Sequence, residues 1–212
     1  DIPAGDDGFD VLLRAVFAFA EDNSHGTDAV FPNRAAILAL SVIVGEERVA
    51  EVARRPIDLG RIDEIRGVRN RVTLRGRNDL ARHFWVSAGL VIVADEGRAM
   101  TVGLGKELMD STPGGSGFSF VDMMANRAGI MFAGAATGNP TAARGMQVRV
   151  SRGMVSDDLL PTVEGLPEGI PDARFRSEFG GLRGEGTRRV NDEITRRLAS
   201  ARGLRPPSDI LH

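Results

Sequence analysis

Two apolar runs constrain the fold of this chain more than any other feature, Ala35–Gly45 and Phe84–Ala94. Each is about half as long as the roughly 20 residues that a membrane-spanning helix needs. We therefore interpret both runs as buried core helices. Phe9–Asp22 predicts another helix, because its apolar residues recur at the spacing of one face that packs on a core. These residues are Phe9, Leu12, Leu13, Val16, Phe17 and Ala20.

Capping residues and breaks predict where the other helices begin and end. We expect the second helix to start near Asn33 as its N-cap and to bend or split at Gly45. Ser119 is the predicted N-cap of a later helix, with Asp122 in its first turn, where the helix dipole favours an acid. The expected ranges of the later helices are 79–95, 98–111, 121–133 and 191–201.

These elements predict a mainly α protein. The helical bundle core covers about residues 9–135 and lies within a core domain of residues 1–135. Residues 136–212 are rich in Gly and Pro, so we expect an extended C-terminal arm that ends in a short helix. This arm is predicted to wrap the core rather than to form an independent domain.

Composition excludes several functional classes. Lys and Arg number 27 against 29 Asp and Glu, which gives a formal net charge of -2 and disfavours nucleic acid as an obligatory partner. The absence of cysteine excludes disulfides, thiolate metal sites and a cysteine nucleophile. The apolar fraction of 42% is that of a folded globular protein. The polar stretch at Asp1 predicts either a cytosolic protein or one from which a leader has been removed.

Polar groups within the most apolar part of the chain form the candidate site. Asp79 and His83 are four residues apart and share a helix face, so Asp79 is predicted to accept a proton from one imidazole nitrogen and fix the tautomer. Glu107 and Asp110 share a face of the next helix, and Asp122 begins the helix after that. Because neighbouring helices with short connections pack antiparallel, the spacing predicts that these groups converge at one end of the bundle.

The loop Gly114–Ser119 adds to this prediction. Its glycines allow close backbone approach, and Ser116 and Ser119 are candidate binding residues. Phe118 and Phe120 would anchor the end of the loop in the core. Two simpler interpretations stay open, a plain linker for the loop and a structural ion-pair network for the carboxylates and His83.

Three strings in the order found here resemble a group of uncharacterised bacterial envelope proteins, the YfiM-type putative lipoproteins and, more distantly, the VanZ-like proteins. The strings are Asn78–Phe84, Gly105–Asp110 and Gly115–Gly129, and the match covers about residues 78–133. The polar positions of that pattern fall on Asp79, His83, Glu107, Asp110, Asp122 and Asn126. The resemblance implies a soluble version of the core, periplasmic or envelope-associated, and brings no established reaction with it.

A weaker analogy is with lysozyme-like lytic enzymes, which present an acid at a helix end before a Ser/Gly loop. On that analogy Glu107 is the general acid/base, Asp122 the second carboxylate and His83 a partner or a substrate binder, acting on a glycan of peptidoglycan. Asp79, Asp110, Ser116, Ser119 and Asn126 are the expected binding residues. No cofactor is predicted.

Two alternatives to an enzyme stay open. The first is a non-catalytic envelope module that binds a protein partner and whose polar cluster is structural. The second is a divalent metal site built from His83, Glu107, Asp110 and Asp122, a donor set that suits Zn, Mn or Fe.

Overall fold

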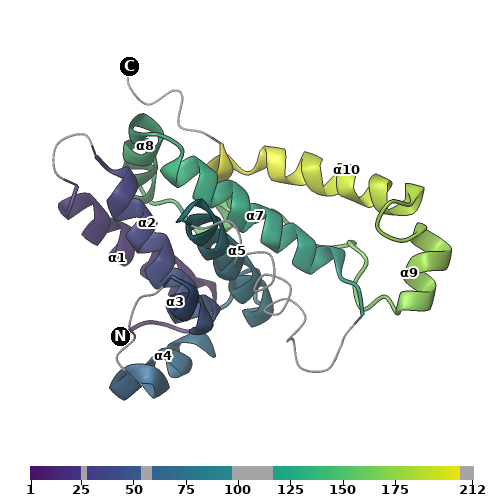
Figure 1. Cartoon of the computed structure of the whole chain (residues 1–212), viewed down its shortest axis with the longest axis horizontal. Helices are drawn as coiled ribbons and strands as arrows, with labels where there is room; N and C mark the ends of the chain where they lie inside the picture. The colour runs from purple at the N-terminus through teal and green to yellow at the C-terminus, as the bar shows by residue number, and fades with distance from the viewer. Residues whose placement is uncertain (25–27, 54–58, 97–116, 206–212) are drawn as a thin grey trace.

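A computed structural model describes residues 1–24, 28–53, 59–96 and 117–205, and the fold of these ranges is mainly α, as the sequence predicts (Figure 1). The α-helices are α1 (Asp6–Asp22), α2 (Val30–Leu40), α3 (Arg48–Val52), α4 (Ile62–Arg69), α5 (Asn78–Glu96), α7 (Phe120–Thr137), α8 (Pro140–Ser151), α9 (Asp172–Phe179) and α10 (Glu185–Ser200). Within the described ranges, β pairing is limited to isolated bridges. None of the described helices is long and apolar enough to cross a membrane.

Helices α5 and α7 lie side by side at the centre of the molecule and run parallel (Figure 1). Their direction follows from residue pairs that advance together, since His83 meets Asp122 and Ser87 meets Asn126 one turn later. Gly129 of α7 lies directly against the α5 backbone, where a Cβ atom would come within 2.0 Å of the Phe84 carbonyl oxygen. The missing side chain therefore allows the two helices to approach closely.

An aromatic cluster fills the space between these helices and α1. The Trp85 ring stacks on Phe9 at a centroid distance of 5.5 Å and meets Phe84 and Phe132 edge to face. All four rings are buried. The same continuous core includes Ile194 and Leu198 of α10, so residues beyond 135 share it.

The C-terminal part of the chain is more helical than its Gly and Pro content suggests. The side chain of Asn139 caps α8 by accepting a hydrogen bond from the backbone N–H of Ala142, and Pro140 follows at the first helical position. Beyond α8 the chain forms a 3-10 turn at Ser156–Asp158 and an irregular segment through residues 160–171 with a turn at 164–165, then α9 and α10 on the side away from α1 and α2 (Figure 1).

The second helix differs from its prediction. It begins at Val30, where Asp28 accepts a hydrogen bond from the backbone N–H, so Asn33 is not its N-cap. Asn33 is instead fully buried and donates hydrogen bonds to the carbonyl oxygens of Ala136 and Ala143. The predicted break at Gly45 is confirmed, because a π-helical turn ends there. The predicted helix 98–111 lies outside the described residues.

Candidate functional site

The candidate site lies where α5 and α7 begin side by side. The Nε2 atom of His83 is 3.6 Å from Oδ2 of Asp122. The sequence prediction that these two groups meet at one end of the bundle is therefore confirmed. Glu107, Asp110 and Ser116, the other members of the predicted cluster, lie outside the described residues.

Asn126, one turn after Asp122 on α7, holds the other side of the imidazole. Its Oδ1 atom is 3.1 Å from His83 Nδ1 and accepts a hydrogen bond of 2.9 Å from the Ser87 hydroxyl. Ser87 is buried, whereas His83 and Asn126 are half-buried. The imidazole is thus clamped between two polar side chains of the same helix, Asn126 and Asp122.

Asp79 does not orient His83, contrary to the sequence prediction. Both of its carboxylate oxygens accept hydrogen bonds from Arg77, from Nε at 3.2 Å and from Nη2 at 2.6 Å. A bidentate bond to a guanidinium is stronger than a bond to a neutral imidazole, which explains the choice of partner. Arg77 also donates to Glu168 at 2.7 Å and lies 3.9 Å from Asp122.

The two aspartates of the cluster experience opposite electrostatic environments. Burial tends to raise the pKa of Asp79, but the hydrogen bonds and charge of Arg77 outweigh it and hold this pKa below its ordinary value. Burial raises the pKa of Asp122, opposed by the charge of protonated His83 and reinforced by the negative charge of Asp79. Opposed pKa shifts in neighbouring acids are typical of sites that transfer protons.

The Oδ1 atom of Asp122 is buried and, among the described residues, makes no hydrogen bond. A buried carboxylate oxygen without a donor costs free energy that native structures normally avoid. This deficit marks Asp122 as the least satisfied group of the cluster.

Ser119 caps α7 as predicted, because its side chain accepts a hydrogen bond from the backbone N–H of Asp122. Phe118 and Phe120 also anchor this end of the loop as predicted. Phe118 stacks on Phe175 at 4.0 Å, and its backbone exchanges two hydrogen bonds with Ile170. A binding role for Ser119 or Asn126 stays a prediction.

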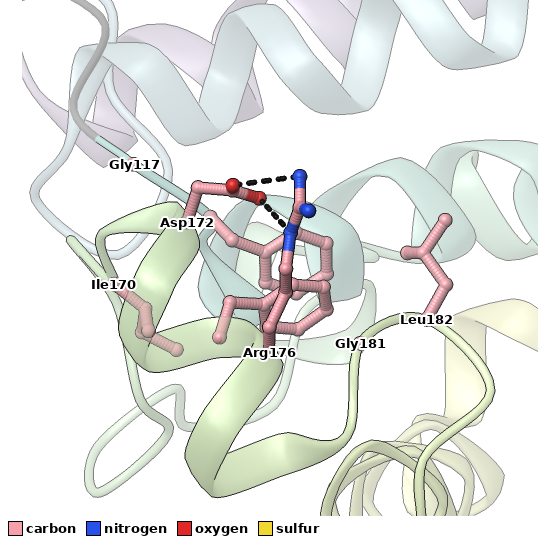
Figure 2. A pocket seen from close by; sticks show the side chains of 8 residues that line it. Gly117, Ile170, Asp172, Arg176, Gly181 and Leu182 are labelled. Atoms are coloured by element: carbon pink, nitrogen blue, oxygen red, sulfur yellow. Dashed lines mark hydrogen bonds and ion pairs between the residues drawn. The ribbon is translucent and has the colours of Figure 1, made fainter.

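A hollow of about 460 Å³ lies beside this anchor. Its floor is apolar, and Figure 2 shows the ion pair of Asp172 and Arg176 on one side and Leu182 on the other. The lining residues are Gly117, Phe118, Ile170, Asp172, Phe175, Arg176, Gly181 and Leu182. Its volume lies within the range of small-molecule pockets.

Three residues of the cluster were missed from sequence. Ser87 carried a usable signal, because it lies four residues after His83 and so shares its helix face. Arg77 precedes the helix, where no periodicity applies. Glu168 reaches the site from a distant irregular segment, and no local pattern connects it with Arg77.

Among residues that the structure describes, no group of three His, Asp or Glu side chains is placed to hold a metal ion. The predicted metal set includes Glu107 and Asp110, which are not described, so it stays a prediction.

No family model matches this chain, and the searches of curated proteins and of solved structures found no match either. The resemblance to YfiM-type proteins therefore rests on the three sequence strings.

Proposed function

We propose that this chain is an envelope-associated bacterial hydrolase that cleaves a cell-wall glycan, with His83 and Asp122 as a proton-transferring pair. The observation that supports this most is the state of Asp122, whose Oδ1 atom is buried and makes no hydrogen bond within the described residues, and whose Oδ2 atom faces His83 Nε2. Burial raises the pKa of Asp122, so its carboxylate is more basic than that of an exposed aspartate, which suits a carboxylate that exchanges a proton with His83.

The reaction class follows from the acids available. Glycosidic cleavage needs one carboxylic acid to protonate the leaving oxygen and a second carboxylate on the other side of the sugar. In this proposal Glu107 is the general acid/base, Asp122 is the second carboxylate and His83 exchanges a proton with it. The glycan substrate rests on the analogy with lysozyme-like lytic enzymes, and the periplasmic location on the resemblance to envelope proteins.

A structural role for the cluster is the second candidate. It is favoured by Arg77, which pairs with Asp79 and Glu168 at once, as a structural ion-pair network would. In that case the protein is a binding or assembly module of the envelope. A metal centre is the third candidate, and elemental analysis of the purified protein tests it directly.

Asp122→Asn separates the first two candidates. For a hydrolase we expect glycan cleavage to fall by roughly 10²–10⁴-fold, the usual loss when a general acid or base is removed. The free energy of unfolding at pH 7 should stay the same or rise, because Asn carries no buried charge. A structural network predicts the reverse, a loss of about 3–5 kcal/mol when one partner is removed.

The pH dependence of stability gives a second readout. Because folding raises the pKa of Asp122, the folded state binds its proton more tightly, so this group costs stability increasingly as pH rises above about 3.8. Any stability gain of Asp122→Asn should therefore be largest near neutral pH and vanish in acid. Asp157→Asn is the control, since Asp157 is exposed and pairs with Arg75 away from the cluster.

The substrates for this test are purified peptidoglycan and its soluble glycan fragments, with cleavage followed by release of reducing ends. Unchanged cleavage by Asp122→Asn, or by Glu107→Gln, contradicts the assigned roles. A wild-type protein that cleaves none of these glycans contradicts the proposed substrate class.

A further inference from the structure

Ser87 is a buried polar residue that the proposed reaction does not use. It lies on α5 one turn after His83, is 2% exposed, and donates its hydroxyl proton to Asn126 Oδ1 at 2.9 Å. A buried helix serine more commonly bonds to a carbonyl of its own helix, as Ser41 does with Ile37. Ser87 instead bonds across the interface between α5 and α7.

In the structure the Ser87 hydroxyl donates to the amide oxygen of Asn126 rather than accepting from its NH₂ group. A side-chain amide can present either its oxygen or its NH₂ group to a neighbour. With the Ser87 proton on Oδ1, this oxygen is the atom that also faces His83 Nδ1, at 3.1 Å. An amide oxygen only accepts hydrogen bonds, so Nδ1 must carry a proton.

The tautomer decides which atom of His83 faces Asp122. When the neutral imidazole carries its proton on Nδ1, its Nε2 presents a lone pair to Asp122 Oδ2, 3.6 Å away. We infer that Ser87 is a positioning residue, which through Asn126 holds His83 in the Nδ1–H tautomer and keeps Nε2 available to exchange a proton with Asp122. The catalytic effect of these hydrogen bonds rests on the proposed function, whereas the tautomer of His83 does not depend on it.

The charged groups around His83 do not change when Ser87 is replaced. Asp122 faces the ring from α7, Asp79 lies one turn earlier on α5, and Arg77 is 3.9 Å from Asp122. A change of tautomer in a Ser87 variant therefore reports the loss of the hydroxyl rather than of a charge.

Long-range ¹H–¹⁵N correlation spectra of the ¹⁵N-labelled full chain, recorded with the imidazoles in their neutral form, measure the tautomer directly. The chain has three histidines, and His83→Gln assigns the signals by their loss. We expect the Nδ1–H form in the wild type and a mixture of both tautomers in Ser87→Ala. Ser41→Ala is the matched control, since Ser41 is also buried but donates to backbone carbonyls, those of Ile37 and Trp85, rather than to a side chain near His83.

Asn126→Asp supplies the closing test. A carboxylate accepts a hydrogen bond from Nδ1–H with either oxygen, so it needs no hydroxyl to orient it. In the Asn126→Asp background, Ser87→Ala should leave the Nδ1–H form intact, whereas Ser87→Ala in the otherwise wild-type chain should give a mixture of tautomers.

On the glycan substrate Ser87→Ala should lower kcat by roughly 10–100-fold, as for other residues that orient a reacting group, with KM nearly constant.

An Nε2–H tautomer in the wild type, or no change of tautomer in Ser87→Ala, overturns the inference. The spectra need no substrate, so the two proposals fail separately. Absence of activity with the expected tautomers contradicts the hydrolase alone, and full activity with an altered tautomer contradicts the positioning role alone.

Discussion

Gly129 sets the distance between the two helices that carry the site. A Cβ atom at this position would lie 2.0 Å from the Phe84 carbonyl oxygen and 3.2 Å from the Ala88 nitrogen. Both are backbone atoms of α5, which cannot rotate away as a side chain can. The contact between His83 and Asp122 therefore depends on the absence of a side chain on a residue that carries no functional group.

Gly129→Ala should destabilise the protein by roughly 1–3 kcal/mol, the usual cost of inserting a methyl group into a packed interface. Gly134→Ala on the same helix is the control, because no atom of the described ranges lies within 4 Å of its Cβ position. There the better helix propensity of Ala should stabilise by about 0.5–1 kcal/mol. Urea denaturation measures both, and equal effects of the two substitutions contradict the close approach of α5 and α7.

At the scale of elements, Asn33 joins helix α2 to the junction of α7 and α8. Its amide donates to the carbonyl oxygen of Ala136, in the last turn of α7. The residue four positions further on is Pro140, which has no backbone N–H to offer that carbonyl. Asn33 supplies the missing donor, and its Oδ1 accepts a hydrogen bond from buried Gln147.

Asn33→Leu should therefore lower the free energy of unfolding by about 2–4 kcal/mol, because it leaves more than one buried polar group without a partner. Asn70→Leu is the matched control on an exposed asparagine at the end of α4, where the change should stay within about 0.5 kcal/mol. Chemical denaturation of the two variants measures both free energies of unfolding. A change at Asn33→Leu as small as that at Asn70→Leu contradicts the role of Asn33 at this junction.

The same residue shows where prediction from sequence ends. Apolar spacing predicted α1 and α5, and Ser119 predicted the start of α7, because these signals lie within one or two turns of chain. The meeting of His83 and Asp122 followed from helix direction alone. Asn33 was predicted as a cap because asparagine is common there. Its true partners lie more than 100 residues away, beyond any local pattern.

Arg77 overturned one part of the predicted site for a similar reason. The four-residue spacing of Asp79 and His83 is compatible with a direct bond, but a guanidinium two residues before Asp79 competes for the carboxylate. Helix periodicity describes neighbours on one face and takes no account of a charged side chain that folds back from the preceding turn. The roles of Glu107, Asp110 and Ser116 stay predictions.

At the scale of the whole molecule, the C-terminal arm and the helical bundle share one core. Ile194 and Leu198 of α10 belong to the same continuous cluster as Trp85 and Phe9. Arg77 of the site also bonds to Glu168 of the arm, so the arm contributes to the polar cluster as well as to the core. This arrangement predicts that the arm and the bundle unfold together.

Trp85 provides a local reporter for that prediction. It is the only tryptophan of the chain, tyrosine is absent, and its ring is 1% exposed at the centre of the bundle. Its fluorescence therefore follows the bundle, whereas far-ultraviolet circular dichroism follows all helices, α10 included.

Leu198→Ala removes a buried side chain of α10 and should lower the free energy of unfolding by about 2–5 kcal/mol. If bundle and arm form one cooperative unit, both signals shift to the same lower midpoint. Leu182→Ala, at a side chain that is 72% exposed in the same arm, should shift neither by more than about 0.5 kcal/mol. The opposite result for Leu198→Ala is a fluorescence midpoint at the wild-type value together with a separate circular dichroism transition at lower denaturant. This result shows that the arm unfolds alone and that the shared core contributes little to the stability of the bundle.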